Sequence, residues 1–120
     1  MDLVALRAAV ESEIENYLYD IHPKAIGRPL PQEWVDAQLI EMRAALVEPT
    51  WRDIKIRDSY EQVIGSAECE IRSCVMVADD RQGYELYFDP TQRDFVLAYS
   101  GDPPVTFNVR GDAVGCFMAR

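Results

Sequence analysis

The stretch that decides the fold is AECEIRSCVMVADDRQGYELYFDPTQRDFVLAYS, residues 67–100. Apolar and charged side chains alternate along residues 67–80 with the period of two that a half-buried strand requires. One face carries Cys69, Ile71, Val75 and Val77, and the other carries Glu68, Glu70 and Arg72. The segments DDRQG and DPTQRD contain the Asp, Gly and Pro residues of turns, so YELYFD and FVLAYS are expected to return as further antiparallel strands.

Towards the C-terminus, the loop GDPP leads to VTFNV, the triplet Arg110-Gly111-Asp112 and a last apolar segment. The triplet has the residue types of a hairpin turn, in which glycine supplies a positive φ. An adhesion role for it would need export, and no leader indicates export. Residues 113–119 are predicted to be a closing strand, with a short helix from Asp112 as the alternative. In both cases we expect residues 113–119 to pack into the hydrophobic core and to be required for folding.

Towards the N-terminus the apolar period becomes that of a helix. Residues 3–21 repeat apolar side chains at steps of three and four. A loop rich in Pro and Gly follows, and a second helix is expected from Pro31 to Glu48-Pro49. The segment 51–58, WRDIKIRD, alternates as a short strand, and Asp58, with Glu61 three residues on, predicts a capped helical turn.

Helices that precede a run of strands indicate an α+β domain. We therefore expect two N-terminal helices packed on one face of a four- to six-stranded antiparallel meander. At 120 residues the chain suits one hydrophobic core, so residues 1–120 are predicted to form a single globular domain.

The net charge of the chain limits the classes of partner that we expect it to bind. A formal net charge of -9, from 21 acidic and 12 basic residues, repels phosphate, so nucleic acid and anionic membranes are not expected as ligands. No apolar run reaches the ~18 residues of a membrane span. The N-terminus lacks a basic leader, which favours a cytoplasmic protein, and the excess of Arg over Lys suggests a bacterial source.

Cysteine and histidine are the residue types that would hold a metal or a nucleophile. The three cysteines and His22 could supply four zinc ligands, but Cys69 and Cys74 are an odd number apart in a strand and face opposite ways. Cys116 and His22 lack close pairing as well. A dyad of His22 with Cys74 or Cys116 is formally open, yet no catalytic motif accompanies it. We therefore predict no catalytic residue, metal or cofactor, and the reactivity of Cys69, Cys74 and Cys116 stays open.

These observations favour a non-enzymatic protein–protein interaction domain that binds a basic partner. Its most concrete version is an immunity or inhibitor protein. The predicted partner surface combines the acidic side of the first helix with the acidic hairpin loops, because acidic patches steer and orient a basic partner. It consists of Glu11, Glu15, Asp79, Asp80 and Asp89.

Two alternatives remain. One is a small-molecule-binding protein or small enzyme with a pocket between helices and sheet, lined by His22, Trp34, Trp51 and Tyr60. The other is subunit assembly through an apolar patch of the second helix, where Ile40 and Val47 lie off the main apolar stripe.

One segment carries a family resemblance. IGRPLPQEW, residues 26–34, is similar to the Gly-x-x-Leu-Pro-x-x-aromatic segment of the SMI1/KNR4 immunity-type family, and YELYFDPTQRDFVLAY resembles the paired strands of such proteins. The resemblance covers about a fifth of the chain, and the Asn-Gly-Gly of the family is not found after the proline-started helix. It implies an interaction protein.

Overall fold

The computed structural model describes residues 1–18 and 30–120. The helices α1 (Leu3–Glu15) and α2 (Gln32–Ala45) come first, followed by β1 (Leu46–Ile56), the short helix α3 (Tyr60–Val63), β2 (Glu70–Asp79), β3 (Tyr84–Asp89), β4 (Asp94–Tyr99), β5 (Val105–Gly111) and α4 (Ala113–Met118). The prediction of an α+β domain, with N-terminal helices packed against an antiparallel sheet, is confirmed.

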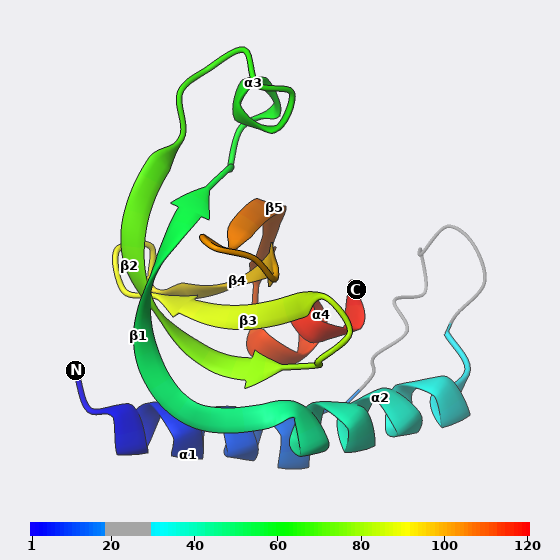
Figure 1. The fold of residues 1–120 in the computed structure, drawn as a ribbon. Coiled ribbons are helices and arrows are strands. Elements are labelled where there is room, and N and C mark those ends of the chain that lie inside the picture. Colours follow the sequence, from blue (N-terminus) through cyan, green and yellow to red (C-terminus); the bar gives the residue numbers. More distant parts are fainter. Residues whose placement is uncertain (19–29) are drawn as a thin grey trace.

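The sheet closes into a barrel with its strands in chain order (Figure 1). Each strand pairs antiparallel with the next one along the chain. The circle is completed by a parallel contact between β1 and β5, where Lys55 lies opposite Val105 and the Lys55 N–H donates to the Pro104 carbonyl at 2.8 Å. Closure gives the sheet an inside and an outside, and this decides which side chains are buried.

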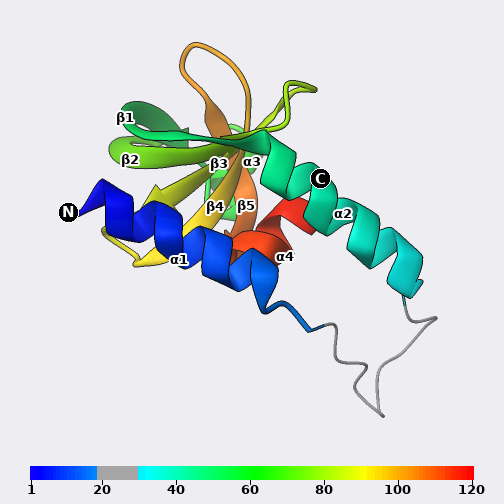
Figure 2. The same cartoon turned by 90° about the horizontal axis from the view of Figure 1, so that it is seen from below.

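The three longer helices cover one side of the barrel. Figure 2 shows α1 and α2 side by side, with α4 close to both. Helix α4 also contacts β3, β4 and β5, so it connects the other two helices with these strands, while α1 and α2 contact β1 and β2 directly. The short helix α3 lies at the far end of the molecule, beyond the tips of β1 and β2 (Figure 1).

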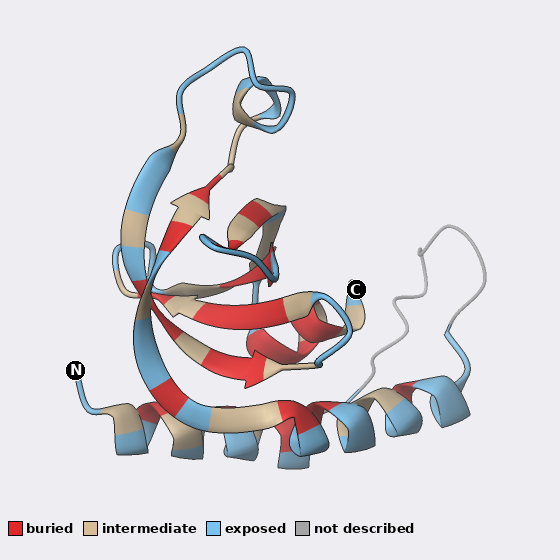
Figure 3. Ribbon diagram, viewed as in Figure 1, coloured by how far each residue is buried: buried red, intermediate tan, exposed pale blue. Residues whose placement is uncertain are grey.

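Buried residues lie on the strands and on the helices (Figure 3). They form two separate cores. The larger core lies between the outer face of the barrel and the helices, and includes Val10, Met42, Leu86, Leu97 and Phe117. The smaller one fills the barrel interior with Ile54, Ile56, Cys74, Tyr87, Val96 and Ala98. Adjacent residues such as Leu86 and Tyr87 belong to different cores because side chains alternate across a strand.

The predicted helix over residues 3–21 is shorter in the structure. Asp2 caps α1, its Oδ1 accepting from the Val4 and Ala5 N–H groups at 3.0 and 3.1 Å. The helix ends at Glu15, where the Asn16 amide donates back to the Ser12 carbonyl at 2.9 Å. Leu18, which the sequence placed on the apolar stripe, is 86 % exposed.

The second helix also ends earlier than predicted, because β1 begins directly at Leu46. Leu46 adopts extended backbone angles and pairs with Ala78. The register of β1 against β2 shifts between Leu46 and Thr50, and Pro49 lies within that irregularity, where a strand tolerates proline.

The two smallest helices refine the remaining predictions. Helix α3 has a capping box, formed by Ser59 and Gln62 in place of the predicted Asp58 and Glu61. Residues 113–118 are helical, so the alternative of a short helix started by Asp112 is the one that the structure supports. An α-helix prevails here because it turns Val114 and Phe117 onto the outer core.

Candidate functional site

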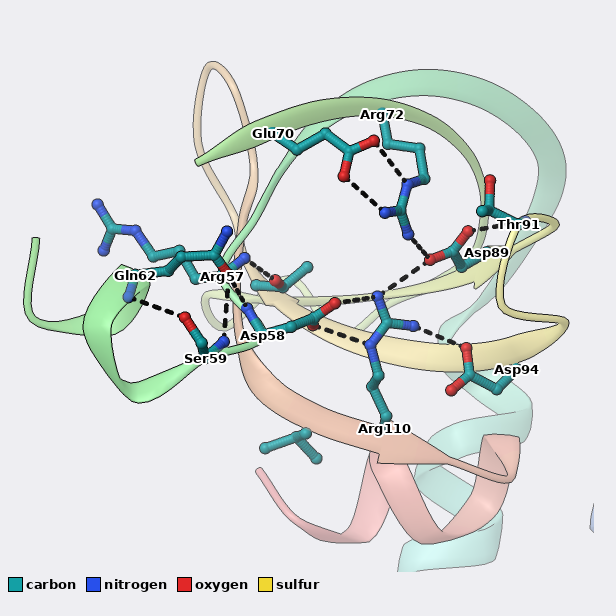
Figure 4. Close-up of polar contacts among 12 residues, drawn as sticks. Arg57, Asp58, Ser59, Gln62, Glu70, Arg72, Asp89, Thr91, Asp94 and Arg110 are labelled. Atoms are coloured by element: carbon teal, nitrogen blue, oxygen red, sulfur yellow. Dashed lines mark hydrogen bonds and ion pairs between the residues drawn. The ribbon is translucent and has the colours of Figure 1, made fainter. Parts of the chain in front are cut away.

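Charged side chains converge inside one end of the barrel (Figure 4). Asp89 of β3 is fully buried and accepts from three directions. The Arg72 Nη1 group of β2 makes a short ion pair with its Oδ2, Arg110 Nη2 of β5 donates to Oδ2 at 3.0 Å, and the Thr91 N–H donates to Oδ1 at 3.0 Å. We call Asp58, Arg72, Asp89, Asp94 and Arg110 the barrel network.

Arg110 contacts three carboxylates of the barrel network. Its Nε and Nη2 donate to the two carboxylate oxygens of Asp58 at 2.8 and 2.9 Å, a bidentate pair. Its Nη1 donates to Asp94 Oδ1 at 2.7 Å. Since Asp58 follows β1, Asp89 ends β3 and Asp94 begins β4, the guanidinium joins β5 to these three segments of the barrel. Arg72 is held in turn by Glu70 at 2.7 Å.

The Asp89 carboxylate and the Arg110 guanidinium both keep their charge at neutral pH. Burial alone would raise the pKa of Asp89, but the hydrogen bonds from Arg110, Arg72 and the Thr91 N–H outweigh burial, and the pKa lies below its ordinary value. Burial alone would lower the pKa of Arg110. The hydrogen bonds to Asp58 and Asp89 outweigh burial, and the pKa of Arg110 lies above its ordinary value. A group that keeps its charge around neutral pH is a poor proton donor or acceptor, so we interpret the barrel network as a structural brace.

A second polar group lines the barrel interior. The Tyr87 hydroxyl donates to Glu85 Oε1 at 2.7 Å, and Arg52 Nη1 lies 3.6 Å from Glu85 Oε2. Burial, reinforced by the hydrogen bond to Glu85, raises the pKa of Tyr87. This phenol therefore stays protonated at neutral pH and satisfies the buried carboxylate.

Sequence reasoning missed the barrel network because it assigned Arg72 to a solvent face. The structure turns Arg72 towards Asp89 in the barrel interior, whereas Glu70 of the same face is exposed and Ile71 of the supposed core face is 57 % exposed. One signal was present: the hairpin DPTQRD sets Asp89 directly opposite Asp94, and two facing carboxylates need a cation between them. Arg110 supplies it.

The cysteines do not provide a reactive group in the barrel. Cys74 is buried beside the barrel network, and burial together with the charge of Asp89 raises the pKa of its thiol to about 12. Burial and the charge of Asp112 do the same for Cys116, also to about 12. Neither forms the thiolate that nucleophilic attack needs. Cys69 is only half buried and lies outside the barrel interior, near α3.

A second candidate region lies on the surface between α2 and the β2–β3 hairpin. Two hollows of about 270 and 300 Å³ meet there, with Asp80, Gln82 and Arg120 lining both. Arg120 donates to Asp80 Oδ2, Gln38 Oε1 and Glu41 Oε2, each at 2.8 Å, and its guanidinium lies 3.8 Å from the centre of the Phe117 ring. Arg120 thus fastens the hairpin to α2. We call the two hollows, together with the exposed side chains Glu33, Trp34, Asp36, Ile40 and Glu41 of α2, the α2 surface.

The predicted partner residues fall into separate places. Glu11 and Glu15 are exposed on α1, and Glu11 is paired with Arg7 at 3.2 Å. Asp79 and Asp80 line the hollow beside α2. Asp89 does not lie at the surface as the sequence predicted. It is fully buried in the barrel network and cannot contact a partner there.

The predicted pocket residues are not brought together. Trp34 lies on α2, Trp51 on β1 and Tyr60 in α3, and α2 and α3 are at opposite ends of the molecule (Figure 1). The outer core fills the layer between helices and sheet where the pocket was expected. His22 lies outside the described residues.

The placement of charge differs sharply between inside and outside. In the part of the chain that the structure describes, thirteen acidic residues are exposed but only three basic ones, Arg43, Arg81 and Arg93. Five arginines, in contrast, are held in ion pairs: Arg7, Arg52, Arg72, Arg110 and Arg120. Two of these arginines, Arg72 and Arg110, lie inside the barrel, and the described surface carries a large excess of acidic residues.

Within residues 1–18 and 30–120, no group of three or more His, Cys, Asp or Glu side chains is placed to hold a metal ion. The helices of the same residues include none with the length and apolar character of a membrane span. No family model, curated protein or solved structure matches the chain. The similarity to the SMI1/KNR4 family thus stays a prediction, and function has to be argued from the geometry.

Proposed function

We propose that this chain is a non-enzymatic protein–protein interaction domain that binds a basic partner through the α2 surface. The observation that carries the proposal is the excess of exposed acidic over exposed basic side chains among the described residues. A basic partner is attracted and oriented by such a surface. An immunity or inhibitor protein for a basic target is the most concrete form of this function.

The α2 surface combines this charge with exposed apolar side chains. Trp34 is 37 % exposed and Ile40 is 71 % exposed, both on α2. Tryptophan is enriched among the residues that contribute most to binding, particularly where it is surrounded by polar groups. Here Gln38, Asp80, Gln82 and Arg120 line the hollow beside Trp34, and Glu33, Asp36 and Glu41 are exposed on the same helix.

The α2 surface is also firmly supported. Val35 and Met42 on the opposite side of the helix are fully buried, and Arg120 ties the helix to the hairpin through Gln38, Glu41 and Asp80. A surface held in place before binding loses less conformational entropy when it forms a complex.

To test the proposal, the chain is used to capture proteins from the native host at increasing salt concentrations. The captured protein is then purified and its affinity for the chain is measured. Trp34→Ala and Asp36→Lys change the proposed contact surface. Glu15→Lys on α1 makes a matched change of charge outside it. We expect Trp34→Ala and Asp36→Lys each to weaken binding about tenfold or more, and Glu15→Lys to change it little.

Two results would contradict the proposal. One is an affinity that does not fall with added salt, because an acidic surface that attracts a basic partner is screened by ions. The other is equal binding by the wild type, Trp34→Ala and Asp36→Lys. Circular dichroism of each variant confirms that the substitutions leave the fold intact.

A further inference from the structure

A hollow of about 340 Å³ lies at the opposite end of the molecule from α2, beside α3. It is lined by Lys55 and Arg57 of the β1 end, by Gln62 of α3, and by the turn that leads from Gly65 to Cys69. Its volume falls at the lower end of the range of small-molecule sites, about 300 to 1,000 Å³. None of these residues belongs to the barrel network or to the α2 surface.

Two cations face this hollow from the same side of the chain. Lys55 and Arg57 are two residues apart, and the side chain between them, Ile56, points into the barrel core. Alternation along the strand therefore directs Lys55 and Arg57 outward together. In a chain with a net charge of -9, a hollow lined by two half-buried cations runs against the general charge of the exterior.

Lys55 and Arg57 also lack the acidic partners that the other half-buried bases have. Among the described residues, Arg7, Arg52, Arg72, Arg110 and Arg120 each contact a carboxylate, whereas no carboxylate lies within ion-pair distance of Lys55 or Arg57. Arg57 Nε is, in the same part of the chain, the one buried side-chain nitrogen or oxygen without a hydrogen-bond partner. A buried donor without an acceptor is unfavourable, so an incoming acceptor would be stabilising.

The other polar groups of the hollow are already engaged. Gln62 Oε1 accepts from the Asp58 and Ser59 N–H groups at 2.8 and 3.1 Å, and its Nε2 donates to the Glu68 carbonyl at 3.1 Å. The Ser66 hydroxyl donates to the Glu61 carbonyl at 3.2 Å. These contacts shape the wall, and the Glu68 side chain is exposed to solvent at its edge. Lys55 and Arg57 therefore remain the groups that select a ligand.

We propose that this hollow binds a small oxyanion, a phosphate or carboxylate group, between Lys55 and Arg57. An oxyanion supplies the acceptors that the Arg57 guanidinium lacks, and charged hydrogen bonds of this kind are stronger than neutral ones. The site lies apart from the α2 surface, so it goes beyond the proposed function and its failure would leave that function standing.

Inorganic phosphate and acetate, added to the folded chain at constant ionic strength, are the probes of the first experiment. We expect saturable changes in the amide NMR signals of Lys55, Arg57 and the 65–69 turn with one or both anions. Arg57→Gln should abolish them, and so should Lys55→Gln. Arg93→Gln, which removes an exposed charge on the β3–β4 turn, is the matched control and should leave the changes intact.

The Cys69 thiol lines the hollow and offers a second measurement. Cys74 and Cys116 are buried with pKa values raised to about 12, so alkylation of the folded chain reports on Cys69. The ratio of its rates with anionic iodoacetate and neutral iodoacetamide measures the local positive potential, because the ionisation of the thiol cancels from the ratio. We expect Arg57→Gln to lower this ratio about threefold or more, and Arg93→Gln to leave it near the wild-type value.

The proposal is overturned if neither anion gives saturable changes at these amides, or if the changes and the alkylation ratio are the same in Arg57→Gln as in the wild type. Acetate alone being bound would restrict the ligand to carboxylates, and phosphate alone would restrict it to phosphates. Both of these outcomes support the site.

Discussion

At the scale of single residues, Asp89 shows how this barrel tolerates charge in its interior. Its carboxylate is fully buried, but Arg72, Arg110 and the Thr91 N–H all donate to it. Breaking a buried ion pair by removing one partner leaves an uncompensated charge and is strongly destabilising. Such a residue is a sensitive measure of whether the barrel network is formed in solution.

We predict that Asp89→Asn lowers the free energy of unfolding by about 3 kcal/mol at neutral pH, because Arg72 and Arg110 lose the anion between them. Urea denaturation measures the change. Asp53→Asn, on the exposed face of β1, removes the same charge where nothing is buried and should change stability by less than about 0.5 kcal/mol.

The effect of Asp89→Asn should depend on pH in a definite direction. Because the folded-state pKa of Asp89 is lowered, its stabilisation is fully present above the unfolded-state value of about 4 and is lost as the pH falls through the folded-state value. The difference between wild type and variant should thus be largest near neutral pH and shrink in acid. A difference that stays constant from neutral pH to about pH 2 would contradict this account.

At the scale of elements, α4 depends on caps that come from two parts of the chain. The Glu13 carboxylate of α1 accepts from the Ala113 and Val114 N–H groups at 3.3 and 2.6 Å, and Asp112 Oδ2 accepts from the Gly115 N–H at 3.1 Å. The first turn of α4 is therefore satisfied partly by a helix about a hundred residues away in sequence. Gly115 fits this arrangement, because a Cβ there would lie 2.5 Å from Asp112 Oδ1.

We predict that Glu13→Ala lowers the free energy of unfolding by about 1 to 2 kcal/mol, since two N–H groups at the start of α4 lose their acceptor. Thermal and urea denaturation provide the measurement. Glu15→Ala, an exposed glutamate on the same helix, is the control and should have a small effect. Equal effects from both substitutions would show that the carboxylate of Glu13 does not cap α4.

At the scale of the whole molecule, the C-terminus joins all the layers. Helix α4 buries Val114 and Phe117 in the outer core, and Arg120 links α2 to the β2–β3 hairpin. Removing this segment would expose the outer face of β3 and β4, including Leu86 and Leu97. The apolar end of the sequence is thus part of the core, as its composition predicted.

We predict that deletion of residues 113–120 abolishes soluble folding, because the outer core loses the buried side chains of α4, Val114, Cys116 and Phe117 among them. Circular dichroism and thermal melting of the truncated chain check this. Arg120→Ala keeps α4 and removes only the links to α2 and the hairpin, so it should fold with a lower melting temperature. A truncated chain that melts like the wild type would contradict the structural role of α4.

Much of the fold was predictable because it rests on local patterns. The apolar period of residues 3–14 predicts α1, and the turn residues of DDRQG and DPTQRD predict the hairpins that join β2, β3 and β4. The helix and strand boundaries were less accurate where tertiary contacts decide them. Leu46 continues an apolar helical stripe in sequence, yet it pairs with Ala78 and begins β1.

The candidate sites were less predictable, because charge does not reveal which way a strand faces. The sequence by itself determined the α+β class, the order of the elements as far as β5 and the acidity of the chain, since composition and short-range periodicity carry these properties. Only the tertiary structure decided that Arg72 of β2 turns into the barrel interior. Closure of β1 on β5 places Arg72 and Arg110 around Asp89, leaves Ile71 exposed, and sets Lys55 and Arg57 beside one hollow. The physical reason is that burial in a closed barrel depends on which strands meet, and that contact joins residues far apart in the chain.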